Sequence, residues 1–151
     1  MADTDRIEKK ILLRAPRSRV WRAVANSGEF GEWFRAKFEG EFAEGALAHG
    51  RITYPGYEHL KMEILVERIA PDHYFAYRWH PYAVDPNVDY SSEPMTLVEF
   101  RLEDAEGGTL LTITESGFDQ IPIERRAQAL KMNEGGWAAQ TLNIERHVSH
   151  A

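Results

Sequence analysis

Apolar and polar residues alternate along most of the chain before residue 116. Over residues 59–69 one face of the pattern is apolar and the other is charged, with Leu60, Met62, Ile64 and Val66 on the apolar face. A period of two is typical of a strand with one buried face. The same pattern predicts strands over residues 6–14, 34–42, 47–54, 74–80, 95–102 and 109–115. Short turn signals such as Glu106-Gly107-Gly108 separate most of these segments, which indicates an antiparallel meander.

Helical spacing occurs near both ends of the chain. Val20, Trp21 and Val24 predict a short helix over residues 16–25, and a further helical turn is expected over 29–33. A longer helix is predicted over 124–148, where steps of three and four residues join Leu130, Glu134, Trp137, Thr141, Ile144 and Val148. Two glycines, Gly135 and Gly136, interrupt this helix, and we interpret them as a site of close packing or of a bend over the sheet.

These elements predict an α+β fold in one domain that spans residues 1–151. An antiparallel sheet with one apolar face has to cover that face, and the long C-terminal helix is the only predicted element large enough. The segment from His80 to Pro94 shows no periodicity and contains three prolines. A segment of this length is either a plain surface loop or a lid over a binding site, and the sequence leaves both interpretations open.

Composition excludes several classes of chemistry. The chain has no cysteine, so it holds no disulfide, iron–sulfur cluster, thiolate zinc site or cysteine nucleophile. Its formal net charge of −6 and the lack of a long basic run argue against nucleic-acid binding. The six histidines are scattered, so we expect no metal. The chain has no Gly-x-Gly-x-x-Gly motif, and we expect no cofactor. The N-terminus lacks a secretory signal and no apolar run is long enough to cross a membrane, so we expect a cytoplasmic protein.

Several short sequence features along the chain resemble those of a known family. They are Ala15-Pro16 before Val20-Trp21, Trp33, Ile69-Ala70-Pro71 before Trp79, Gly108-Thr109, the run from Glu115 to Phe118, and Gly136-Trp137. In this order and spacing the chain resembles the START-like helix-grip (SRPBCC) superfamily, in the branch related to activators of the heat-shock-protein ATPase. The resemblance implies a seven-stranded antiparallel sheet around a long C-terminal helix, with a cavity between them. It also implies binding of lipids, sterols, polyketides or other apolar small molecules, and some relatives are cyclases or aromatases.

The first functional hypothesis is that this chain binds an apolar small molecule in such a cavity. The predicted ligand-binding residues are Trp33, Tyr54, Met62, Tyr77, Trp79, Phe100, Glu115, Glu134 and Trp137, and the loop residues Tyr82 and Tyr90 are expected near the cavity mouth. A pocket of this kind needs apolar walls with a few polar groups. The alternative is that the same side chains fill a solid core, because periodicity cannot separate a cavity wall from a core.

Two carboxylates on otherwise apolar faces, Glu115 and Glu134, allow other functions. A carboxylate that faces an apolar cavity can act as an acid or a base, as in a cyclase or hydratase. The interpretation we favour is that Glu115 lies in water at its strand end and that Glu134 pairs with a cation such as Arg78 or Arg101. We therefore assign no catalytic residue and rank an enzyme third. A protein-interaction module with a chaperone or other protein partner ranks second, and the chain is expected to be a monomer or a homodimer.

Overall fold

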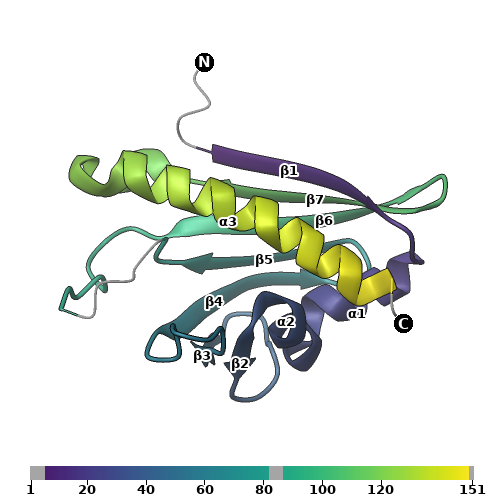
Figure 1. The fold of residues 1–151 in the computed structure, drawn as a ribbon, viewed down its shortest axis with the longest axis horizontal. Helices are drawn as coiled ribbons and strands as arrows, with labels where there is room; N and C mark the ends of the chain where they lie inside the picture. The colour runs from purple at the N-terminus through teal and green to yellow at the C-terminus, as the bar shows by residue number, and fades with distance from the viewer. Residues whose placement is uncertain (1–5, 82–86, 150–151) are drawn as a thin grey trace.

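The structure is a computed structural model that describes residues 6–81 and 87–149. Seven strands form one antiparallel sheet in the order β1-β7-β6-β5-β4-β3-β2 (Figure 1). The strands are β1 (Arg6–Leu13), β2 (Ala36–Phe38), β3 (Leu47–Ile52), β4 (Lys61–Ala70), β5 (Tyr74–Trp79), β6 (Thr96–Ala105) and β7 (Gly108–Ser116). Consecutive strands from β2 to β7 are neighbours, so the meander predicted from the alternation is confirmed.

Helices cover one face of this sheet. α1 (Arg17–Ala25) and α2 (Ser27–Phe34) lie between β1 and β2 in sequence, and a short 3-10 turn, η1 (Phe118–Gln120), leads into α3 (Ile123–Ser149). The long α3 runs diagonally across the sheet, and its C-terminal end meets α1 and α2 (Figure 1). The predicted α+β helix-grip fold is therefore confirmed. Within residues 6–81 and 87–149, no helix has the length and apolar character that a membrane span requires.

Local signals explain where α2 begins and ends. The Asn26 side chain accepts a hydrogen bond from the backbone N–H of Glu29, which caps the helix. Arg35 has a left-handed φ of 70° and closes the helix after Phe34. Because α2 extends to Phe34, the strand expected over residues 34–42 shortens to the three residues of β2.

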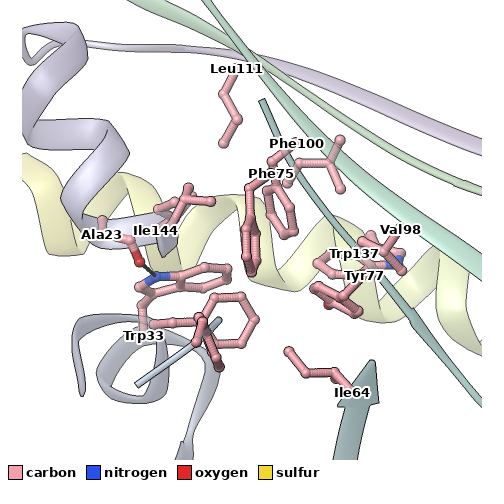
Figure 2. Close-up of a cluster of buried hydrophobic side chains, with 14 of the residues drawn as sticks. Ala23, Trp33, Ile64, Phe75, Tyr77, Val98, Phe100, Leu111, Trp137 and Ile144 are labelled. Carbon is pink, nitrogen blue, oxygen red and sulfur yellow. Dashed lines mark hydrogen bonds between the residues drawn. The ribbon is translucent and has the colours of Figure 1, made fainter. Parts of the chain in front are cut away.

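Aromatic and aliphatic side chains pack together between the sheet and the helices (Figure 2). Phe30, Phe75, Tyr77 and Phe100 have no solvent-exposed surface. The ring centroid of Phe30 lies 4.8 Å from that of Trp33 and 6.2 Å from those of Tyr77 and Phe100. This part of the interior is therefore a packed core, as the alternative interpretation of the apolar faces proposed.

The structure also describes part of the predicted loop and the two glycines of α3. Residues 80–81 and 87–95 form no helix or strand, while residues 82–86 of the predicted loop lie outside the described residues. The close-packing interpretation of Gly135 and Gly136 is wrong, because a Cβ added to either would meet no atom within 4 Å. Both glycines are exposed to solvent.

Candidate functional site

A pocket of about 160 Å³ opens between the middle of α3, the end of β5 and the end of α2. Its walls are Phe34, Trp79, Asn133, Gly136, Trp137 and Gln140. Three of these six residues are aromatic, and none carries a charge. The pocket therefore combines apolar walls with two side-chain amides.

Glu115 lies beside this pocket and is completely buried. The alternation of β7 turns it to the same inward face as Leu111 and Ile113, and the sheet register places it opposite Val98 of β6. Because an inward position is normally apolar, the carboxylate needs polar partners around it. It finds them on β5, β6 and α3.

Four side chains donate hydrogen bonds to the Glu115 carboxylate. Oε1 accepts from Trp137 Nε1 at 2.8 Å and from Asn133 Nδ2 at 3.0 Å. Oε2 accepts from Thr96 Oγ1 at 2.6 Å, from Trp79 Nε1 at 2.8 Å and from Asn133 Nδ2 at 3.1 Å. An indole N–H and an amide NH₂ only donate, and an ionised carboxylate only accepts, so this arrangement suits a negatively charged Glu115.

No cation among the described residues forms an ion pair with Glu115. The charge of Glu115 also acts on Tyr77, which lies in the same row of the sheet two strands away. Burial and the nearby charge of Glu115 raise the pKa of the Tyr77 phenol well above its usual value. The Tyr77 hydroxyl is buried and has no hydrogen-bond partner among the described residues.

The hydrogen bonds to Glu115 also fix the two tryptophan rings. Their N–H groups point at the carboxylate, so their ring carbons are left to face the pocket. The ring centroids of Trp79 and Trp137 lie 5.9 Å apart, and the Phe34 centroid lies 6.0 Å from each. The result is a cluster of three aromatic rings, two of which are held by hydrogen bonds to Glu115.

Comparison with known proteins identifies the family. Residues 14–149 match the family described as activator of Hsp90 ATPase homolog 1-like protein. The chain belongs to this family. The resemblance predicted from the sequence is thus confirmed for family and fold. No functionally curated protein matches the chain significantly.

Solved structures share the fold of this family member. A protein from Mesorhizobium loti has a TM-score of 0.76 at 20% identity, over 97% of this chain and 98% of that one. A protein from Arthrobacter aurescens has a TM-score of 0.77 at 20% identity, over 100% of this chain and 91% of its own. The Aha1 dimer from Colwellia psychrerythraea has a TM-score of 0.67 at 16% identity, over 93% and 92%. At these identities the likeness shows the fold alone.

The structure brings three of the predicted site residues together. Trp79 and Trp137 line the pocket, and Glu115 lies behind them. The favoured interpretation that Glu115 lies in water is wrong, because the carboxylate is fully buried. Its strand continues one residue further than predicted and is covered there by α3, which the alternation of β7 could not reveal.

Glu134 lies outside the pocket, so the expectation that it faces a cavity is wrong. Its side chain is 62% exposed and lies 3.8 Å from Lys9 Nζ, so the favoured interpretation that Glu134 pairs with a cation is confirmed, with Lys9 as the partner in place of Arg78 or Arg101. The neighbouring Asn133 points inward instead. Both residues stand at helical spacing from Trp137, so the apolar stripe could not decide between them.

Other predicted residues belong to the core or the surface. Met62, Tyr77 and Phe100 are buried away from the pocket walls, and Trp33 donates its indole N–H to the backbone oxygen of Ala23. Exposed Tyr54 packs on Tyr57, with ring centroids 5.8 Å apart. Tyr90 lies beneath the Arg125 guanidinium, and Tyr82 is outside the described residues.

The sequence analysis missed four wall residues, Phe34, Asn133, Gly136 and Gln140. Asn133 and Gln140 stand four residues before and three residues after Trp137. That spacing places them on the inward side of α3 and was the signal that could have found them. Both residues are polar, so the apolar stripe from which this helix is predicted does not include them.

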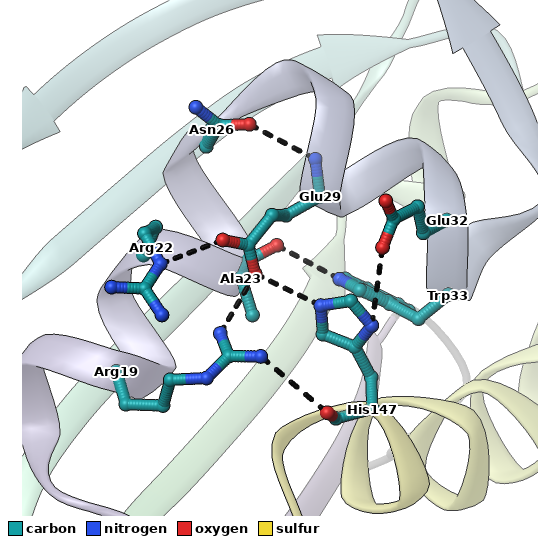
Figure 3. Close-up of polar contacts among 8 residues, drawn as sticks. All are labelled: Arg19, Arg22, Ala23, Asn26, Glu29, Glu32, Trp33 and His147. Atoms are coloured by element: carbon teal, nitrogen blue, oxygen red, sulfur yellow. Dashed lines mark hydrogen bonds and ion pairs between the residues drawn. The ribbon is translucent and has the colours of Figure 1, made fainter. Parts of the chain in front are cut away.

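A second polar cluster joins the ends of three helices (Figure 3). Glu29 of α2 accepts hydrogen bonds from Arg19 at 2.7 Å and Arg22 at 2.6 Å, and lies 2.9 Å from His147 Nε2 of α3. Burial raises the pKa of Glu29, but the hydrogen bonds of His147, Arg19 and Arg22 outweigh it and lower the pKa to about 2. Within the described part of the chain, no group of histidines and carboxylates is arranged to hold a metal ion.

Proposed function

We propose that the chain binds a small organic molecule in the pocket beside α3. The observation that carries this proposal is the open aromatic wall of Phe34, Trp79 and Trp137. Apolar walls with a few oriented polar groups are typical of ligand sites. The volume of about 160 Å³ is well below the roughly 300–1,000 Å³ of sites for drug-sized ligands, which favours a smaller molecule.

The buried carboxylate supports the proposal. An ionised group in the interior is costly unless it is hydrogen bonded, and an apolar side chain in the same place would avoid that cost. Glu115 holds both indole rings and the Asn133 amide in one orientation. In preorganised binding sites, neighbouring groups hold the ligand-contacting side chains in one orientation in this way.

The geometry favours binding over acid–base catalysis. Both oxygens of Glu115 already accept at least two hydrogen bonds, so neither is free to take a proton from a substrate. The other candidate acid, Glu134, is on the surface and paired with Lys9. Glu115 therefore acts on the wall residues, as a positioning residue.

Two adjacent glycines provide a matched test of the proposed site. Gly136 lines the pocket and Gly135 does not, yet a side chain at either position meets open space. We expect monocyclic aromatic compounds to bind wild type and Gly135→Leu equally in ligand-observed NMR, whereas Gly136→Leu loses them. If the folded wild type binds none of them, or if Gly136→Leu binds as well as wild type, the proposal is wrong.

A protein-binding role is the second candidate, favoured by apolar side chains on the outward side of α3. Met132 is 47% exposed and Leu142 is 55% exposed. The partner that we propose for this surface is a second copy of the chain, since one structural neighbour is described as a dimer. Light scattering is expected to show a dimer that Leu142→Glu dissociates. A wild-type monomer at high micromolar concentration would contradict it.

A further inference from the structure

We infer that this pocket selects small organic cations, such as primary ammonium compounds, over neutral or anionic molecules of the same shape. The inference rests on the proposed function and adds the chemical class of the ligand. Three features of the site point to it: a buried charge without an ion-pair partner, free acceptor atoms, and aromatic rings in the pocket wall.

The first feature is electrostatic. Glu115 is buried and no described cation pairs with it, and the six wall residues carry no charge. On α3, Arg126 stands about 10.5 Å along the axis from Asn133 and donates to the backbone oxygen of Ile121. Arg125, about 12 Å away, is paired with Glu93. The Arg35 guanidinium lies over the Tyr54 ring. The pocket therefore lies next to a negative charge that is buried and that no ion pair neutralises.

The second feature is the direction of the two wall amides. Asn133 donates through Nδ2 to Glu115, and no described residue donates to its Oδ1. The carboxylate dictates this orientation, because a flipped amide would set oxygen against oxygen. Gln140 donates through Nε2 to the backbone oxygen of Phe34. Its Oε1 accepts one bond, from Asn143, and keeps a second lone pair. Both amides therefore offer acceptors to a ligand.

The third feature is the aromatic wall. The N–H groups of Trp79 and Trp137 both donate to Glu115, so these wall residues offer a ligand no donor and meet it with the carbon atoms of their rings. The face of an aromatic ring attracts a cation, and tryptophan does so best. A ligand with N⁺–H donors would thus match the acceptors, the π-faces and the buried charge together, whereas a carboxylate would meet only acceptors.

Three compounds of nearly equal size test this selectivity: benzylammonium, benzyl alcohol and benzoate. We expect the wild-type chain at pH 7 to bind benzylammonium about tenfold more tightly than benzyl alcohol, and benzoate most weakly. Titrations followed by tryptophan fluorescence, with excitation where the ligands do not absorb, measure the three dissociation constants. If benzyl alcohol or benzoate binds as tightly as benzylammonium, this inference is overturned while the proposed pocket stands. If none of the three binds, the proposed function fails as well.

Two glutamate variants separate the buried charge from net charge. Glu115→Gln and Glu134→Gln each remove one negative charge, but only Glu115 lies behind the pocket. We expect Glu134→Gln to keep the preference for benzylammonium, and a folded Glu115→Gln to lose most of it. An unchanged preference in Glu115→Gln would overturn the role of the buried charge. If that variant does not fold, the three compounds on wild type still decide the selectivity.

Discussion

At the scale of single residues, Glu115 is unusual because a carboxylate normally lies in water or beside a cation. It is a carboxylate without any exposed surface, and it is stabilised by four donating side chains rather than by a cation. Hydrogen bonds to a charged acceptor are stronger than those between neutral groups. The stability of this site should therefore depend strongly on each donor.

The two buried threonines Thr96 and Thr109 test that dependence. Thr96 donates to the Glu115 carboxylate, and Thr109 donates to the neutral backbone oxygen of Ala15. Both side chains are fully buried. We expect Thr96→Val to lower the free energy of unfolding by about 1.5–3 kcal/mol and Thr109→Val by about 0.5–1.5 kcal/mol. Denaturant titrations measure both, and equal losses would argue that Glu115 is not charged.

The unpartnered hydroxyl of Tyr77 leads to the opposite expectation. Because it is buried without a hydrogen bond, Tyr77→Phe should leave the free energy of unfolding unchanged or raise it by up to about 1 kcal/mol. Tyr74 is the control, since its hydroxyl donates to Glu99. We expect Tyr74→Phe to cost about 1 kcal/mol in the same denaturant titrations. A larger loss in Tyr77→Phe than in Tyr74→Phe would show that the Tyr77 hydroxyl has a partner.

At the scale of elements, the inward and outward sides of α3 differ in their residues. Its inward side supplies Asn133, Trp137 and Gln140 to the pocket, while its outward side carries Gly135 beside exposed apolar residues. A glycine inside a helix is less favourable than alanine by about 1 kcal/mol. Nothing in the packing of the described residues requires a glycine at 135 or 136.

Gly135→Ala should therefore raise the free energy of unfolding by about 0.5–1 kcal/mol. Gly31 of α2 is the contrasting position, because a Cβ there would lie 2.1 Å from the backbone oxygen of Ala36. We expect Gly31→Ala to destabilise the fold clearly in thermal unfolding. Destabilisation by Gly135→Ala would mean that the outward side of α3 is packed against another surface.

At the scale of the whole molecule, the Glu29 cluster joins α1 and α2 to the end of α3. The pKa of Glu29 is lowered to about 2 in the folded chain, against 4.5 as its ordinary value. Protonation of Glu29 therefore favours the unfolded chain. The ionised carboxylate contributes to stability above pH 4.5, and this contribution is lost as the pH falls from 4.5 towards 2.

Glu29→Gln should remove this pH dependence. We expect wild type to exceed the variant in free energy of unfolding by up to about 3 kcal/mol at neutral pH, and the difference to shrink to zero near pH 2. Denaturant titrations at several pH values give both curves. A difference that stays constant between pH 5 and pH 2 would contradict the lowered pKa.

The periodicity of the sequence was sufficient to predict the fold, but only part of the site. Alternation and helical spacing mark buried faces, so the seven strands and α3 were within reach. The site depends on which of two adjacent helix residues turns inward, and Asn133 and Glu134 fit the same spacing. It also depends on how far α3 covers the end of β7, which decides whether Glu115 meets water or indole N–H groups. Both are properties of tertiary packing.

The central claim is that a small cation binds against the rings held by Glu115, and indole N–H signals report on it most directly. Trp79 and Trp137 donate to Glu115, whereas Trp33 donates to Ala23 in the core. In ¹H–¹⁵N spectra, assigned with single Trp→Phe variants, we expect benzylammonium to move the Trp79 and Trp137 signals saturably. The Trp33 signal should stay in place. If Trp79 and Trp137 do not move, or if Trp33 moves as far as they do, the ligand does not occupy this pocket and the account is wrong.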